Sequence, residues 1–239
     1  MIDALKWFFS SPTPVVAVLS FLIAYSTYLY QRTWNRKQKA HQISVWYGKV
    51  AIPKSRYIKR IFQKIGVSTY ANKFTEIRHF TSNELKNNLE KADCTEEEFI
   101  SKFELITEEL LDDAYRHSGC GEDIHKSHTL LKEALDANGK LEYAVFNRFI
   151  IDFLNELETV ALQINCNIAE GSLIYPILHQ SFLWGIKSWY FFIAKENQFD
   201  HNRFYPNVIA LYLSWDAKAK EDEDNYNKTA SKKNALRKI

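Results

Sequence analysis

One long interval of the chain carries no charge, and it restricts the possible folds more than any other feature. No charged residue occurs between Lys6 and Arg32, and residues 15–23 are rich in valine, leucine and isoleucine. As a helix, this interval is long enough to cross a hydrocarbon core of about 30 Å, which needs roughly 20 mostly apolar residues. Thr13 and Pro14 suit the start of such a helix. We therefore predict a transmembrane anchor over residues 1–35.

The charges on the two sides of this interval predict its orientation. The N-terminal side carries Asp3 and Lys6, whereas the C-terminal side carries a basic cluster of Arg32, Arg36, Lys37 and Lys39. Basic residues accumulate on the cytoplasmic side of membrane helices and contact anionic lipid headgroups. The expectation is a single-pass inner-membrane protein with its N-terminus outside, its domain in the cytoplasm and the basic cluster at the membrane surface.

Two other interpretations of the apolar interval were weighed. A cleaved signal peptide has basic residues before its apolar core and small residues at a cleavage site after it. In this chain the basic cluster follows the core, and no such small-residue site is present. The second alternative, a buried core helix of a soluble protein, is disfavoured by the aromatic residues on both sides and by the abrupt basic boundary.

Glycine and proline are scarce, with seven and five residues in a chain of 239. All-β chains need many turns, so this scarcity predicts long helices. The fold class expected is all-α, with one N-terminal transmembrane helix followed by an irregular cytoplasmic helical bundle. Its expected parts are the anchor, a basic juxtamembrane helical segment over 36–80, a helical domain over 81–216 and a charged, disordered tail over 217–239. Cys94, Cys120 and Cys166 are expected as free thiols.

Local patterns predict particular helices in the domain. Thr95 and Glu98 form a capping-box pattern, and an apolar stripe from Phe99 to Ala114 predicts one helix after it. A central helix is expected over residues 140–169. The apolar segment 172–194 could be a second membrane span, but Lys187 would be costly in a bilayer, so a buried core helix is favoured.

The best candidate for a metal site lies in a glycine-containing loop. A thiolate and imidazoles suit zinc, and the loop offers four such residues: His117, Cys120, His125 and His128. Their order, H-x2-C-x4-H-x2-H, matches no standard zinc-finger spacing. An ordinary polar loop between helices is therefore the favoured interpretation, with zinc as the alternative and no other cofactor expected.

Nothing in the chain predicts catalysis. Phosphate-binding, dinucleotide-binding, nucleophile-elbow and zinc-protease motifs are all missing from the sequence. Asp112 and Asp113 belong to an acidic run that is expected to form a solvated helix face. Asp152 and Glu156, an i,i+4 pair with Arg148 one turn earlier on the same face, are typical of a structural ion-pair row. Nucleic-acid binding is not expected, because membrane topology already explains the basic residues.

The C-terminal third resembles an uncharacterised bacterial family. The shared elements are F-L-N-x-L-E at residues 153–158, I-A-E-G-S-L at residues 168–173 and a terminal aromatic helix, over roughly residues 145–216. Members have one N-terminal membrane helix and a helical cytoplasmic domain, so the resemblance implies this topology. It implies no activity and no site residues.

These observations predict a membrane-anchored helical module that binds a protein partner or a second copy of itself and is not an enzyme. The alternative is a membrane effector of a phage-defence or toxin type that acts by oligomerising in the bilayer. Small residues on one helix face favour pairing of membrane helices. Ala17, Ser20, Ala24 and Thr27 follow such a spacing.

Overall fold

The computed structural model describes residues 12–119, 121–198 and 203–236. Within these ranges the regular structure is helical, and β-type pairing is limited to two isolated bridges, Thr107 with Lys140 and Leu135 with Leu141. The predicted all-α class is confirmed.

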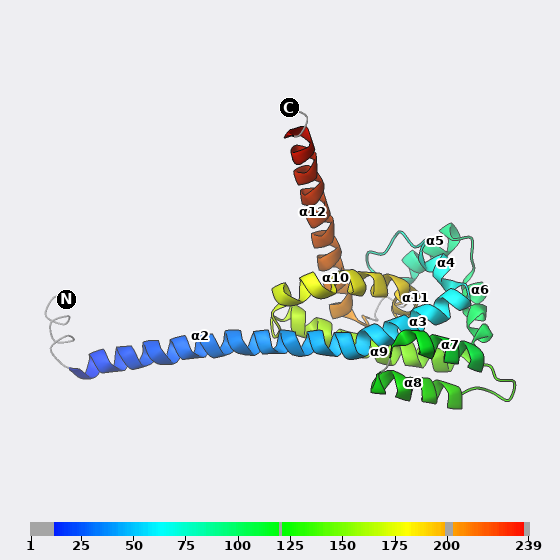
Figure 1. The fold of residues 1–239 in the computed structure, drawn as a ribbon, viewed down its shortest axis with the longest axis horizontal. Coiled ribbons are helices and arrows are strands. Elements are labelled where there is room, and N and C mark those ends of the chain that lie inside the picture. The colour runs from blue at the N-terminus through cyan, green and yellow to red at the C-terminus, as the bar shows by residue number, and fades with distance from the viewer. Residues whose placement is uncertain (1–11, 120, 199–202, 237–239) are drawn as a thin grey trace.

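A single long rod begins the described chain and ends inside the protein. α2 (Pro12–Trp46) continues through a π-helical turn, η1 (Tyr47–Ala51), into α3 (Ile52–Lys64) (Figure 1). Pro53 stands at the start of α3 and lacks the N–H that an α-helix would use at this position. The wider turn relieves that conflict without ending the helix. The rod therefore changes helix type at this point and continues into α3.

The predicted membrane anchor falls on α2. Among the helices of the described residues, none is both long and apolar enough to cross a membrane. Residues 1–11 of the predicted anchor lie outside the described residues.

The other helices follow in this order: α4 (Val67–Ala71), α5 (Ser82–Lys91), α6 (Glu96–Ser101), the 3-10 helix η2 (Lys102–Leu105), α7 (Glu108–Ser118), α8 (Glu122–Glu133), α9 (Tyr143–Asn165), α10 (Gly171–Ser188), α11 (Tyr190–Glu196) and α12 (Pro206–Leu236). α3 packs on α7, α9 packs on α12, and α10 lies against both α2 and α12. We call the packed part, residues 36–216, the body. The free part of α2 and the end of α12 project from it in different directions (Figure 1).

One hydrophobic core runs through the body, from Ala40 on α2 to Trp215 on α12. Tyr57 and Ile58 of α3 are fully buried in it, and seven other elements contribute buried aromatic residues: η1, α6, η2, α9, α10, α11 and α12. Phe99 and Phe191 stack at its centre with ring centroids 4.1 Å apart. The segment 36–80, predicted as a separate juxtamembrane part, therefore shares its core with residues 81–216.

The capping box at Thr95 is confirmed, but the helix after it is shorter than predicted. The Thr95 hydroxyl accepts a hydrogen bond from the Glu98 N–H, and the Glu98 carboxylate accepts one from the Thr95 N–H. The chain is extended at Ile106, whose carbonyl pairs with the N–H of Leu141. Thr107 then caps α7. The pairing of Ile106 with Leu141 thus divides the apolar stripe from Phe99 to Ala114 between separate helices. The same pairing keeps Leu141 out of α9, which begins only at Tyr143.

Residues 172–194 form two helices, α10 and α11, separated at Trp189. Their inner side chains, including Ile174, Phe182 and Phe192, are buried in the core as the core-helix interpretation predicted.

The charged tail differs from its predicted disorder. α12 continues as a helix to Leu236, supported by an i,i+4 ion pair of Lys220 with Asp216 at 2.6 Å. Tyr175 of α10 also donates a hydrogen bond to Asp222. The composition of residues 217–239 predicts disorder because apolar residues are few there. The first half of α12 is packed on the body, however, and favourable helix propensity together with these two contacts continues the helix beyond it.

Candidate functional site

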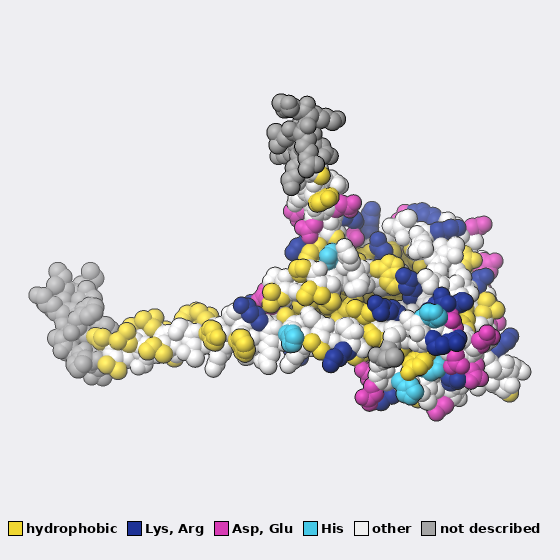
Figure 2. All heavy atoms as spheres, in the orientation of Figure 1, with side chains coloured by type: hydrophobic (Ala, Val, Ile, Leu, Met, Phe, Trp, Pro, Cys, Tyr) yellow, Lys and Arg dark blue, Asp and Glu magenta, His cyan; other side chains and the backbone are white. Residues whose placement is uncertain are grey.

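The free part of α2 is the most unusual surface of the molecule. We call residues 15–35 the arm. Its large apolar side chains are exposed, with Phe21 67% and Ile23 66% accessible, and Figure 2 shows them along the rod with no charged side chain until its base. Successive residues of a helix are rotated by about 100°. The exposed side chains at positions 18, 19, 21, 22 and 23 therefore cover most sides of the arm.

The remaining side of the arm carries the small residues Ala17, Ser20, Ala24 and Thr27. The Thr27 hydroxyl is bonded back to the carbonyl of Ile23 at 2.8 Å, so its polar group is satisfied within the helix. The arm thus has a broad bulky apolar surface and one narrow small-residue face.

The predicted membrane-surface cations stand where the arm joins the body. Arg32 and Lys37 are exposed and Lys39 is partly buried. Arg36 forms an ion pair with Glu170 at 2.9 Å, and its carbonyl accepts a hydrogen bond from the Glu170 N–H at 3.2 Å. The base of the arm is therefore fastened to the start of α10. Further along the rod, Lys54 of α3 forms an ion pair with Glu156 of α9 at 2.8 Å and so connects two helices of the body.

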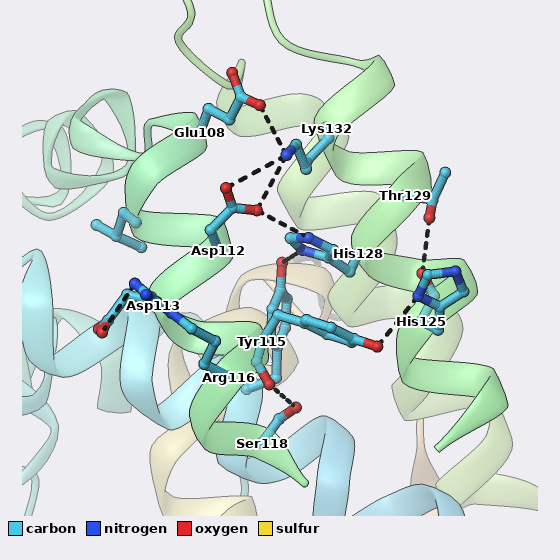
Figure 3. Close-up of polar contacts among 12 residues, drawn as sticks. Glu108, Asp112, Asp113, Tyr115, Arg116, Ser118, His125, His128, Thr129 and Lys132 are labelled. Atoms are coloured by element: carbon cyan, nitrogen blue, oxygen red, sulfur yellow. Dashed lines mark hydrogen bonds and ion pairs between the residues drawn. The ribbon is translucent and has the colours of Figure 1, made fainter. Parts of the chain in front are cut away.

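The second candidate region is a polar cluster between α3, α7 and α8 (Figure 3). His128 is buried there, and its Nε2 lies 3.1 Å from Asp112 Oδ1. Its Nδ1 lies 3.3 Å from the hydroxyl of Tyr57, and the ring of Tyr115 stacks on it at 4.5 Å. Lys132 joins Asp112 and Glu108 at 3.0 and 2.7 Å.

The protonation states of His128 and Asp112 determine which group donates each hydrogen bond. Burial lowers the pKa of His128, opposed by the nearby Asp112 carboxylate, whereas the hydrogen bond from Lys132 lowers the pKa of Asp112. A carboxylate only accepts hydrogen bonds, so Nε2 of the neutral imidazole donates to Asp112 and Nδ1 accepts from Tyr57. Both ring nitrogens of His128 are therefore hydrogen-bonded, one to Asp112 and the other to Tyr57.

The other predicted zinc ligands face different partners. His125 Nδ1 lies 3.2 Å from the Tyr115 hydroxyl, and His117 Nδ1 lies 2.7 Å from the Asp113 carbonyl. Within the described residues no three His, Cys, Asp or Glu side chains are placed to hold a metal ion. Cys120 lies outside those residues, so the zinc alternative that includes it stays a prediction.

The adjacent acids Asp112 and Asp113 point to opposite sides of α7. Asp113 accepts a hydrogen bond from Arg60 of α3 at 2.7 Å, and that contact lowers its pKa. Asp112 faces α8 instead. Each acid therefore braces α7 against a different neighbour, a role that the expected solvated face did not predict.

Sequence reasoning missed several members of these sites, among them Tyr57, Lys132 and Glu170. Each is far in sequence from its partner, and no local motif marks it. The sequence gives only an indirect signal for them. Glu170 is an acid in an otherwise apolar turn and Tyr57 is a tyrosine in a basic helix, and a polar group of either kind needs a polar partner when it is buried.

No protein-family model matches this chain, and no curated protein or solved structure shows significant similarity to it.

Proposed function

We propose that this protein is a membrane-attached helical binding module, held on the bilayer by the arm. One observation carries the proposal: bulky apolar side chains are exposed around most of a helix that projects free of the body. A helix that is apolar on most sides needs an apolar environment on most sides, which a bilayer supplies and a single protein groove does not. The proposal goes beyond the described helices, none of which meets the requirement for a complete span.

The basic residues at the base of the arm orient the module. Arg32, Lys37 and Lys39 lie on the side of the body, and each basic residue near an anionic leaflet contributes about 1 kcal/mol of attraction. This charge distribution favours a body on the cytoplasmic side, which the family resemblance also implies. Attachment confines the search for a partner to the plane of the membrane and raises its effective concentration.

Membrane fractionation of the full chain tests the attachment. The native protein is expected in the membrane fraction after washing with alkaline carbonate. Leu19→Lys with Ile23→Lys should move it to the soluble fraction, because a lysine inside the bilayer costs about 2.5–3.5 kcal/mol on insertion scales. The matched control is Leu130→Lys, a similarly exposed leucine on α8. Native protein in the soluble fraction would refute the proposal.

The module's partner is sought by cross-linking in native membranes, followed by identification of the attached proteins. Binding predicts a reproducible partner, or a cross-linked copy of the chain itself. A body that cross-links to nothing above the level of the arm double variant would contradict the binding role.

The small-residue face favours a second candidate, an effector that oligomerises in the bilayer. Small residues let membrane helices approach closely, and Ala17 and Ala24 lie on one face of the arm. Conditional expression should then depolarise the membrane, and Ala17→Leu with Ala24→Leu should abolish this. Val16→Leu with Ile23→Leu changes a different face and serves as control. Lack of toxicity at high expression would count against the effector.

A further inference from the structure

The turn between α9 and α10 is rigid and lies beside the base of the arm. Asn167 adopts a left-handed conformation, with φ 55°. The N–H groups of Ile168 and Asn167 donate to the carbonyls of Gln163 and Ile164, at 2.9 and 3.1 Å. These two bonds complete a Schellman motif, which closes the end of α9. The ion pair of Glu170 with Arg36 then fastens the turn to α2, at the end of the body from which the arm leaves (Figure 1).

This turn presents apolar side chains that are about half exposed. In a Schellman motif the residue at the position of Ile168 commonly packs on a residue at the position of Gln163 or of Leu162. Gln163 offers no apolar surface of that kind, and Ile168 is 51% exposed. Leu173 at the start of α10 and Leu162 near the end of α9 are 47% and 42% exposed. Three large apolar groups thus flank one fixed turn.

The charges around the turn suit an anionic surface. Arg32 and Lys37 are exposed on the adjoining part of α2. Between Glu158 and Glu196 the only acidic residue is Glu170, and its carboxylate is paired with Arg36. An anionic layer would therefore meet exposed cations and no free carboxylate from this turn.

The height of the turn matches the headgroup layer. The uncharged interval ends at Gln31, and Arg36 lies about 8 Å further along α2 at a rise of about 1.5 Å per residue. Each headgroup layer of a bilayer is about 5–8 Å deep, because the total thickness is about 40–45 Å and the hydrocarbon core about 30 Å. If Gln31 stands at the edge of the hydrocarbon, the turn reaches the outer headgroups, and a tilt of α2 toward that side brings it deeper.

We infer that the α9–α10 turn is a second membrane contact, which docks Ile168, Leu162 and Leu173 into the interface of an anionic bilayer. This inference rests on the proposed attachment through the arm. Two contacts at different distances from the axis of α2 prevent free rotation of the body about its anchor. The body therefore presents one constant face to partners in the membrane plane.

Fluorescence quenching on vesicles of phosphatidylcholine and phosphatidylglycerol tests the contact. Cys166 is exposed in this turn, so an environment-sensitive dye is attached there in the full chain carrying Cys94→Ala and Cys120→Ser. Comparison labels are placed at Ile23→Cys in the arm and at Leu130→Cys on α8, each in the same background with Cys166→Ser. We expect vesicles to reduce quenching by aqueous acrylamide severalfold at positions 166 and 23, with no change at 130.

Ile168→Glu should restore quenching at position 166 and leave position 23 protected, whereas Leu130→Glu should change neither. Because Ile168 is half exposed, the fold should persist, which circular dichroism checks. Equal quenching at 166 and 130 with position 23 protected would overturn the second contact and leave the arm proposal standing. Free quenching at position 23 would overturn the attachment and this inference together.

Discussion

Asn88 is fully buried on α5, and its side-chain amide organises the irregular segment before that helix. Its oxygen accepts hydrogen bonds from the N–H groups of Thr75 and Glu76, at 2.8 and 3.2 Å. Its nitrogen donates to the Glu76 carbonyl at 2.9 Å and to the Tyr190 hydroxyl at 3.3 Å. The Glu84 carboxylate accepts hydrogen bonds from the N–H groups of Arg78 and His79 in the same way, so two side chains of α5 hold a segment without regular structure by satisfying its backbone groups.

We predict that Asn88→Ala lowers the free energy of unfolding by about 3 kcal/mol, because buried backbone groups lose their partners. Urea unfolding followed by circular dichroism measures this. Asn87→Ala, at the exposed neighbouring position, is the control and should stay within about 0.5 kcal/mol of the native protein. Equal effects of the two substitutions would show that the amide network is unimportant.

His128 gives the fold a pH dependence of known sign. Burial lowers its pKa below the usual 6.5, against the opposing Asp112 charge, so the unfolded chain binds a proton more readily than the folded one. The stabilisation is complete above about pH 6.5 and is lost as the pH falls through the lower folded value. Thermal unfolding between pH 8 and pH 5 should therefore show a smaller decline for His128→Gln than for the native protein. Parallel declines would contradict this assignment.

At the scale of elements, the break between α10 and α11 depends on close packing at one glycine. A β-carbon at Gly185 would lie 2.8 Å from a ring carbon of Trp189, and that indole packs edge-on against Phe153 at 4.9 Å. The ring cannot move aside without disturbing the core, so the position requires glycine although alanine is the better helix former.

Gly185→Ala should therefore destabilise the protein by about 1–3 kcal/mol, the usual cost of overpacking, despite a gain of about 1 kcal/mol in helix propensity. Gly48→Ala is the matched control, since a β-carbon there meets no atom within 4 Å. We expect it to be neutral or stabilising. Thermal unfolding of both variants distinguishes the cost of overpacking against Trp189 from the gain in helix propensity. An unchanged midpoint for Gly185→Ala would refute the packing argument.

At the scale of the whole molecule, the arm and the body are energetically separate. The core begins at Ala40, and the last fastening of α2 toward the arm is the Arg36–Glu170 pair. Removing residues 1–34 should thus leave the thermal midpoint of the body unchanged, and it should abolish the membrane attachment that we propose. Calorimetry of the shortened chain in buffer checks this. Loss of its cooperative transition would mean that the arm contributes to folding.

The parts predictable from sequence are those set by neighbours in the chain. The all-α class followed from scarce turn residues, the Thr95–Glu98 capping box from spacing of three, and the apolar arm from an interval without charge. Caps and helical stripes involve groups within one or two turns of each other, so their physical cause is written locally.

Features that depend on contacts between residues far apart in the sequence were decided only by the tertiary structure. The extended residue Ile106 divides a periodic stripe because Leu141 pairs with it. His128 is occupied on both nitrogens because α3 and α7 bring Tyr57 and Asp112 to it. The α9–α10 turn lies at the base of the arm because Arg36 binds Glu170. Each pairing closes a long loop of chain and is stable only once the core has formed around it, so no local pattern in the sequence announces it.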